Sequence, residues 1–151
     1  MTIQTALQIR HAVEKDATML AALSNQLGYP ASAPQVALRL SKILPDPNQA
    51  IFVAEQPDLG VIGWIHLYQH WLVEEDQTAE IGGVVVDQNY RGRGIGKLLI
   101  NAAEQWAQDA GCTGIHLRSN ILRKEAHQFY LNLGYQINKT QLSFIKLFDQ
   151  L

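Results

Sequence analysis

The sequence is poor in cysteine and in charged residues, and it has no long hydrophobic run. Cys112 is the only cysteine among 151 residues, which excludes an internal disulfide and a cysteine-rich zinc site. Charged residues make up 17% of the chain and balance to a net charge of −2, which argues against a surface built for nucleic acid or an anionic membrane. No apolar run approaches the ~20 residues of a membrane span, and no basic segment followed by an apolar one opens the chain. We therefore expect a cytoplasmic protein without a metal site, a nucleic-acid partner or a membrane partner.

Hydrophobic residues, by contrast, are abundant. They make up 47% of the chain, which excludes disorder and provides for a packed core. A length of 151 residues fits one domain, and neither a repeat nor a linker interrupts the chain. We expect a single domain over residues 1–151.

Hydrophobic periodicity predicts the order of the secondary structure. Alternating and apolar segments predict strands at residues 7–13, 50–55, 61–68, 79–86, 113–117, 135–139 and 142–148, with an acidic connection at 71–77. Apolar residues at helical spacing predict helices at 17–27 and 33–44, a third with its stripe at 99–110, and a fourth at 122–133. This order is typical of a mixed sheet flanked by helices, an α/β or α+β three-layer fold.

The most informative segment lies between the strand at 79–86 and the third helix. It carries three glycines and three cations, namely Arg91, Gly92, Arg93, Gly94, Gly96 and Lys97. Glycines allow backbone N–H groups to converge, and the N-terminus of a helix carries about half a positive charge. The combination is typical of a cradle for a phosphate or diphosphate. An ordinary glycine-rich turn needs fewer glycines and no cations.

Two nucleotide-binding motifs fail at this segment. A Walker A loop needs glycine at position 91 and Ser or Thr after the lysine, where the sequence has Arg91 and Leu98. A dinucleotide fingerprint puts its third glycine at position 97 or 99, and neither residue is glycine. A nucleotide-binding module is therefore disfavoured.

The same segment resembles the acetyl-CoA signature of the GNAT family of N-acetyltransferases. The signature is Arg91-x-x-Gly94-x-Gly96, after a strand that ends Val84-Val85-Val86. Further family positions follow at Asn120, Ala126, Phe129, Tyr130, Gly134 and Tyr135. The predicted element order matches the family over nearly the whole chain. The resemblance implies the GNAT fold, in which a splayed, V-shaped slot in a mixed sheet holds acetyl-CoA.

The resemblance implies that acetyl-CoA is bound by Val84, Val85, Val86, Arg91, Gly92, Arg93, Gly94, Ile95, Gly96, Lys97 and Asn120. Backbone groups around Val84 and Val86 would pair with the pantetheine amides as one strand pairs with another, while Val85 faces the core. Gly82 and Gly83, just before them, are typical of a bulge or a close backbone approach, or else they simply loosen the strand. Asn120 would hydrogen-bond the pantetheine arm, although as a bare residue it is also a turn former.

The resemblance also implies direct attack of an amine on the acetyl thioester, with Glu80 and Tyr130 as the catalytic residues. An alkylammonium has a pKa of about 10 and must lose a proton first, so Glu80, the lone carboxylate of an apolar strand, is the candidate base. Tyr130 matches the acid that protonates the departing thiolate, and a backbone N–H near Val84 is the candidate oxyanion donor. Taken as residues alone, Glu80 could also be a strand-end carboxylate that faces solvent or an arginine, and Tyr130 could also be a ring that only packs.

The resemblance implies that the acceptor is a small molecule with a primary amine and that Tyr29, Tyr68 and Trp71 are candidate walls of its pocket. The run at 120–130 resembles aminoalkylphosphonate N-acetyltransferases in particular, although that subgroup carries an acidic residue where Gly83 stands. Two alternatives stay open: acetylation of a protein or peptide amine, and a non-catalytic sensor of acetyl-CoA. The apolar segment at 142–148 offers a strand edge for a homodimer.

Overall fold

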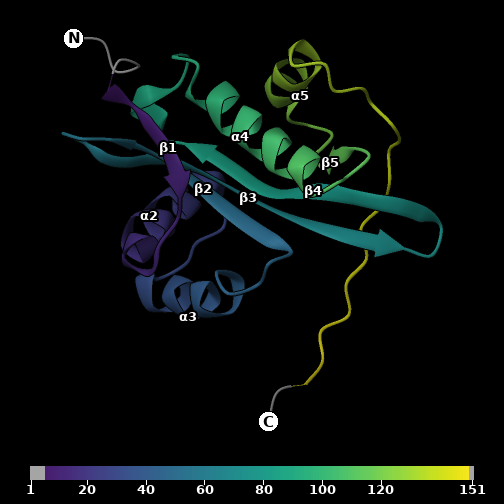
Figure 1. Cartoon of the computed structure of the whole chain (residues 1–151), viewed down its shortest axis with the longest axis horizontal. Coiled ribbons are helices and arrows are strands. Elements are labelled where there is room, and N and C mark those ends of the chain that lie inside the picture. The colour runs from purple at the N-terminus through teal and green to yellow at the C-terminus, as the bar shows by residue number, and fades with distance from the viewer. Residues whose placement is uncertain (1–5, 150–151) are drawn as a thin grey trace. The chain divides into compact units, whose positions relative to one another are not determined.

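The computed structural model describes residues 6–149, which divide into two compact units. The first unit ends at Arg118 and contains, in chain order, β1 (Gln8–His11), η1 (Glu14–Asp16), α2 (Ala17–Leu27), α3 (Ala33–Ile43), β2 (Gln49–Gln56), β3 (Gly60–Leu72), β4 (Glu75–Val86), η2 (Gln88–Tyr90), α4 (Ile95–Asp109) and β5 (Ile115–Leu117) (Figure 1). The second unit begins at Ser119 and contains α5 (Lys124–Asn132). Among residues 6–149, every helix is too short or too polar to span a lipid bilayer. A single domain over the whole chain stays a prediction.

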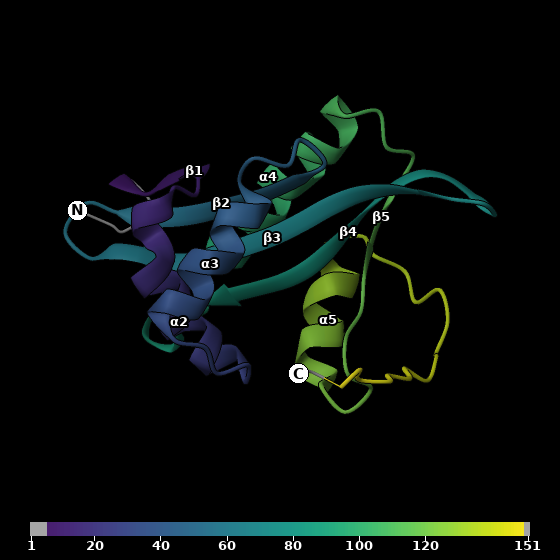
Figure 2. The same ribbon diagram turned by 90° about the horizontal axis from the view of Figure 1, so that it is seen from below.

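Among the described residues, a five-stranded sheet forms the middle of the first unit. Its strand order is β1-β2-β3-β4-β5, with antiparallel pairs from β1 to β4 and a parallel pair between β4 and β5. Figure 1 shows α2 and α3 on one face of the sheet and α4 on the other, and Figure 2 shows the same layers from below. The predicted mixed sheet between helical layers is confirmed.

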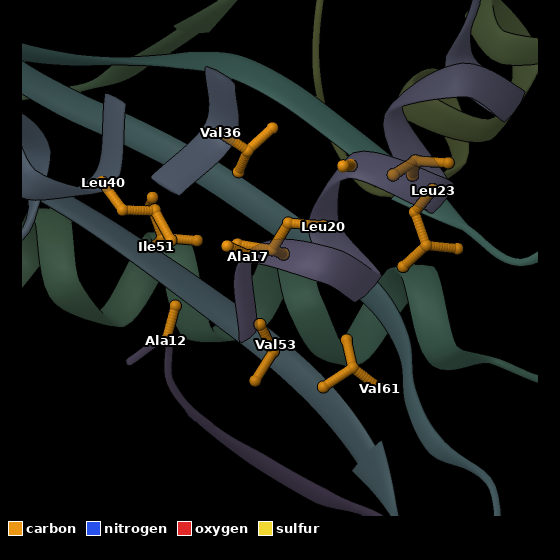
Figure 3. Packing of buried hydrophobic residues seen from close by; sticks show 11 residues of the cluster. Ala12, Ala17, Leu20, Leu23, Val36, Leu40, Ile51, Val53 and Val61 are labelled. Carbon is orange, nitrogen blue, oxygen red and sulfur yellow. The ribbon is translucent and has the colours of Figure 1, made fainter. Parts of the chain in front are cut away.

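A cluster of buried side chains joins α2 and α3 to the sheet (Figure 3). Leu23 of α2 and Leu40 of α3 are 1% and 2% exposed, and Val53 of β2 is 0% exposed. Burial of an aliphatic side chain of this size contributes about 1.5–3 kcal/mol relative to leaving it exposed. Val85 of β4 belongs to the same cluster, as the sequence predicts. Since successive side chains of a strand alternate between faces, the residues on either side of Val85 face the other way.

Local signals set the ends of α2 and α3. α2 ends at Gly28, whose φ of +96° is the left-handed backbone that suits glycine. α3 begins after Ser32, whose Oγ accepts the N–H of Gln35 at 3.2 Å while Gln35 Oε1 accepts the N–H of Ser32 at 2.9 Å. The glycine stop and this reciprocal capping box define the short loop in which Tyr29 lies.

The connection expected at 71–77 is wrong, because both strands continue through most of it. β3 runs to Leu72 and β4 begins at Glu75, and these two residues pair across the hairpin. Backbone hydrogen bonding between the strands outweighs the weak strand preference of the acidic residues, which stay exposed to water near the tip. The hairpin projects past the shorter strands of the sheet (Figure 1).

The strands expected at 135–139 and 142–148 are also wrong. Within the described part of the chain, residues 135–149 form neither helix nor strand. Their large apolar side chains are exposed, namely Ile137, Leu142, Phe144, Ile145, Leu147 and Phe148. An alternating pattern becomes a strand only where a neighbouring strand accepts its backbone hydrogen bonds, and none of the described strands pairs with this segment.

An arginine between two carboxylates ties β1 to η1 and β2. Arg10 donates to Asp16 through Nη1 and Nη2, both at 2.9 Å, and to Glu55 through Nε at 3.1 Å. Asp16 is 5% exposed and also accepts the N–H of Val13 at 2.8 Å. Burial by itself raises the pKa of Asp16, but the hydrogen bonds from Arg10 and Val13 outweigh it and hold the pKa below its ordinary value. The Asp16 carboxylate therefore stabilises the fold in its charged form.

We expect Asp16→Asn to destabilise the fold by about 2–3 kcal/mol, because it leaves Arg10 and the N–H of Val13 with a weaker acceptor. The pKa of Asp16 is lower in the folded chain than in the unfolded chain. Its stabilising effect is therefore complete above the unfolded value of about 3.9 and is lost as the pH falls through the folded value. Urea unfolding of the wild type and of Asp16→Asn should give free energies of unfolding that converge as the pH falls. A difference in the free energy of unfolding that stays constant from neutral to strongly acidic pH would contradict a stabilising role of the charged Asp16 carboxylate.

Candidate active site

One edge of β4 is open over the second half of the strand. β3 pairs with β4 from Glu75 to Val86, but β5 pairs only with Ala79, Glu80 and Ile81. Within the described residues, no strand pairs with that edge from Gly82 onward. Backbone groups on an unpaired strand edge are available to an extended ligand, as in β-strand addition. This open edge of β4 matches the slot that the family resemblance implies.

A bulge lies at Gly82, directly after the last residue that pairs with β5. His66 of β3 pairs with Gly83 and Leu67 pairs with Ile81, which leaves Gly82 as the extra residue. The bulge expected at the two glycines is confirmed. A bulge bends its strand and increases the local twist, so its position agrees with the end of pairing to β5.

The Trp64 indole fills the space beside Gly83. A Cβ at Gly83 would lie 3.0 Å from Cη2 and 3.1 Å from Cζ3 of Trp64. A Cβ at Gly82 would meet nothing closer than 3.6 Å. The two glycines therefore serve different purposes, close packing at Gly83 and an irregular backbone at Gly82.

The open edge of β4 leads to the N-terminus of α4. Gly92 and Gly94 have left-handed backbone, with φ of +77° and +81°. Gly94 is the N-cap of this 15-residue helix and, having no side chain, makes no capping hydrogen bond to the first turn. Ile95 is 1% exposed, so it can contribute only its backbone N–H to a ligand. The first N–H groups of a helix have no partner within it and form the positive end of its dipole, so they suit an anion.

Three exposed cations surround this helix end, namely Arg91, Arg93 and Lys97. Arg91 Nε donates to the carbonyl of Val86 at 3.0 Å, which ties the loop to the end of β4. The guanidinium carbon of Arg93 lies 5.3 Å from the centre of the Tyr90 ring. Gly96 lies in the first turn of α4. Glycines, cations and helix N-terminus are thus gathered in one place, and the ligand that they bind stays a prediction.

Glu80 lies in the middle of β4, just before the open edge, and not at the start of the strand as the sequence suggests. It is opposite Tyr68 on β3 and opposite His116 on β5. The Tyr68 hydroxyl donates to Glu80 Oε2 at 2.7 Å, and Arg118 Nη2 lies 3.8 Å from Glu80 Oε1. The Glu80 side chain is only 15% exposed, so a carboxylate that faces solvent is wrong, whereas the alternative of a carboxylate that faces an arginine agrees with Arg118.

The groups beside Glu80 on β3 are neutral around neutral pH. Burial and the hydrogen bond to Glu80 raise the pKa of Tyr68 to about 12, so its hydroxyl stays protonated. His66 Nε2 lies 2.8 Å from Gln49 Oε1, and burial lowers the pKa of this histidine. A neutral phenol and a neutral imidazole therefore line β3 near the carboxylate.

Sequence reasoning missed Arg118, and it missed the contact that Gln26 makes with Gln88. Arg118 follows β5 and reaches Glu80, and the only sequence signal for it was a cation directly after the strand expected at 113–117. Gln26, near the end of α2, accepts the N–H of Gln88 through Oε1 at 2.9 Å and so ties α2 to the loop before α4. No pattern in the sequence indicates this contact, because it depends on how α2 packs on the sheet.

Of the three aromatics expected to wall an acceptor pocket, Tyr68 is the one that adjoins Glu80. Tyr29 lies in the loop between α2 and α3 and is 72% exposed, and Trp71 lies near the tip of the β3–β4 hairpin and is 69% exposed. Within the described part of the chain, no ring contact and no hydrogen bond joins any two of these three side chains. The pocket role of Tyr29 and Trp71 stays a prediction.

Asn120 and Tyr130 lie in the second unit. Asn120 Oδ1 accepts the N–H of Leu122 at 2.9 Å, which is the turn-forming role. Tyr130 lies on α5 with its ring centre 5.3 Å from that of Phe129 and 6.1 Å from that of Tyr135. Burial raises the pKa of Tyr130, so its hydroxyl is protonated at neutral pH. The binding role of Asn120 and the acid role of Tyr130 stay predictions.

The first unit therefore offers three chemical functions. The open edge of β4 can hold an extended chain that carries amides, the N-terminus of α4 can hold an anion at the end of that chain, and Glu80 can hold a cation and take its proton. Within the described residues, no three histidine, cysteine or carboxylate side chains lie close enough together to hold a metal ion.

Comparison with known proteins identifies relatives along most of the chain. The sequence profile of the acetyltransferase (GNAT) family matches residues 17–135. The aminoalkylphosphonate N-acetyltransferase of Salmonella typhimurium is 34% identical over 140 residues, which cover 89% of this chain and 88% of that protein. The aminoglycoside N(6')-acetyltransferase type 1 of Stenotrophomonas maltophilia is 28% identical over 138 residues, which cover 89% of each chain.

Solved structures share the fold. A crystal structure described as a transcriptional regulator from Bacillus halodurans C-125 matches with a TM-score of 0.83 at 25% identity, covering 93% of this chain and 99% of that one. A structure of AAC(6')-Iy in complex with the bisubstrate analog CoA-S-monomethyl-acetylneamine matches with a TM-score of 0.82 at 19% identity, covering 93% and 98%. This second likeness concerns the fold alone.

We expect Gly83→Ala to destabilise the fold by about 1–3 kcal/mol, because its Cβ would displace the Trp64 indole. Gly82→Ala is the matched control. Its Cβ would make only ordinary van der Waals contacts, so the free energy of unfolding should change by less than about 0.5 kcal/mol. Urea unfolding followed by tryptophan fluorescence measures both variants. Equal losses in the two would show that packing against Trp64 is not the reason for glycine at position 83.

Proposed function

The chain belongs to the GNAT family of acetyltransferases, and on this premise we propose that it transfers the acetyl group of acetyl-CoA directly to the primary amine of a small molecule. The observation that carries the proposal is the open edge of β4 leading to the uncapped N-terminus of α4. A linear molecule with amides along its length and a diphosphate towards one end fits both features, and acetyl-CoA is such a molecule.

The proposed binding residues divide into two groups. Along the open edge, backbone groups of Val84 and Val86 pair with the pantetheine amides, while Val85 anchors the strand in the core. At the N-terminus of α4, backbone N–H groups from Gly92 to Lys97 hold the diphosphate, and the exposed cations Arg91 and Arg93 add charge around it. Asn120 is proposed to bind the pantetheine arm.

Glu80 is the proposed base. A primary amine with a pKa of about 10 is an ammonium at neutral pH and must lose a proton before its nitrogen can attack. The Glu80 carboxylate can attract the ammonium and then accept that proton. Its position supports this role, because it is mostly buried and lies immediately before the open edge of β4.

Two further groups complete the proposed reaction. As the C–N bond forms, a backbone N–H near Val84 stabilises the charge that develops on the carbonyl oxygen. As the C–S bond breaks, Tyr130 donates its proton to the sulfur, and the second proton that the nitrogen loses as the amide forms restores the phenol. Burial raises the pKa of Tyr130, so the phenol holds its proton until the departing thiolate, whose thiol has a pKa of ~8.5, lies within hydrogen-bond distance.

The proposed acceptor is a small primary amine, because both curated relatives are named for small-molecule amine acceptors, an aminoalkylphosphonate in one case and an aminoglycoside in the other. We also propose a homodimer, since the apolar side chains exposed at 142–148 would be buried by pairing with a second copy. A cytoplasmic location stays a prediction from the sequence.

We expect isothermal titration calorimetry to detect binding of acetyl-CoA, and no binding of ATP or NAD. Gly94→Ala should weaken acetyl-CoA binding about tenfold, because left-handed backbone costs a residue with Cβ roughly 1–2 kcal/mol and the N-cap geometry is lost. Gly60→Ala is the matched control, since Gly60 has the same φ of +81° at the start of β3, directly after the turn from β2. The Gly60→Ala variant should lose a similar free energy of unfolding and should bind acetyl-CoA with unchanged affinity. Tight ATP binding without acetyl-CoA binding would refute the proposed function.

We expect Glu80→Gln to lower kcat/KM by about 10²-fold or more and Tyr130→Phe to lower kcat by about 10²-fold, because each removes a proton-transfer group. Release of free thiol with a panel of primary amines measures both. Glu55→Gln, which removes another arginine-paired carboxylate, is the control and should keep its activity. Full activity in both test variants would exclude these catalytic roles. Binding of acetyl-CoA without release of free thiol in the presence of any amine would support the alternative of a non-catalytic acetyl-CoA sensor.

A further inference from the structure

We infer that Tyr68 is a positioning residue for Glu80: its hydroxyl holds one carboxylate oxygen in place, so that the other oxygen faces the acceptor amine. This inference rests on the proposed role of Glu80 as the base. It gives Tyr68 a function beyond the aromatic pocket wall that the sequence suggests.

The contact between the two side chains is built into the sheet. Tyr68 and Glu80 are direct partners in the antiparallel ladder of β3 and β4, and their side chains meet at 2.7 Å. Leu67 and Ala79, which flank the pair on the two strands, are each 0% exposed. A slip of one residue would turn these buried side chains towards solvent, so the core fixes the register that brings the phenol to the carboxylate.

The Tyr68 ring is also held along its own strand. Its centre lies 6.3 Å from that of His66 and 5.8 Å from that of His70, one on each side. Tyrosine has few rotatable bonds, so a ring packed in this way loses little further freedom when its hydroxyl bonds to Glu80. The Tyr68 hydroxyl is therefore a preorganised hydrogen-bond donor to Glu80.

The two oxygens of Glu80 have different partners. The hydroxyl of Tyr68 makes a short, charge-assisted hydrogen bond to Oε2. Arg118 lies 3.8 Å from Oε1, and its side chain is 77% exposed, so solvent screens this ion pair and the long side chain is free to exchange. Tyr68 thus fixes Oε2, and Oε1, whose Arg118 partner can exchange, is the oxygen left to receive an incoming ammonium.

Tyr68 acts through Glu80 and not as a base itself. Burial and the carboxylate raise the pKa of Tyr68 to about 12, so the phenol keeps its proton at working pH. The other titratable or charged groups around the carboxylate are His66 and His70 on β3, His116 opposite Glu80 on β5, Glu75 at 4.0 Å from His116, and Arg118. The phenol is the one described group that donates a hydrogen bond to the carboxylate.

The first test is a double-mutant cycle of Tyr68→Phe and Glu80→Gln. Tyr68→Phe keeps the ring and removes only the donor, so we expect kcat to fall about tenfold with little change in the KM for acetyl-CoA. In the Glu80→Gln background the same change should alter kcat/KM less than about twofold, since the two residues act as one unit.

A second measurement is independent of turnover. The ¹³C NMR chemical shift of the Glu80 carboxyl at neutral pH should change in Tyr68→Phe, at an unchanged unfolding midpoint, because Oε2 loses its hydrogen-bond donor. An unchanged chemical shift, or an equal loss of kcat/KM with and without Glu80, would overturn the positioning role. Full activity of Glu80→Gln, with the NMR shift still present, would instead refute Glu80 as the base. The two failures are therefore distinguishable.

Discussion

The short pairing between β4 and β5 is the constraint on which the candidate site depends. β5 hydrogen-bonds to β4 only at Ala79, Glu80 and Ile81, and the bulge at Gly82 coincides with the end of this pairing. An unpaired strand edge inside a sheet is costly unless a ligand or water satisfies its backbone groups. The same edge leads to a helix N-terminus that lacks a side-chain cap, which prefers a negative charge. Together these two unsatisfied backbone features favour the proposed ligand, which is extended, rich in amides and anionic at one end.

The packing that stabilises the fold also places the chemistry. The cluster beneath α2 and α3 takes Val85 into the core, so Val84 and Val86 face the opposite way beside the open edge. The ladder that buries Leu67 and Ala79 also sets Tyr68 against Glu80. In both cases the position of a functional group follows from the register of β4 with β3, because a strand shifted by one residue would reverse every side chain.

Sequence patterns predicted the parts of the fold that depend on local physics. Glycine at position 28 ends α2 in left-handed backbone, and the paired glycines of β4 form the expected bulge. The patterns failed where a neighbouring segment decides the outcome. The acidic residues at 71–77 join a hairpin because the two strands pair with each other, whereas the alternating residues at 135–149 remain irregular because no described strand pairs with them.

By itself, the sequence determined the helices and the central strands, the glycine and arginine loop before α4, and Glu80 as an isolated carboxylate, since each rests on neighbours within a few residues. Only the tertiary structure decided that β4 has an open edge, that Trp64 fills the space at Gly83, and that Tyr68 donates a hydrogen bond to Glu80. These features arise from strand register and from packing between segments far apart in the chain, and periodicity carries no information about which residues of two strands lie opposite one another.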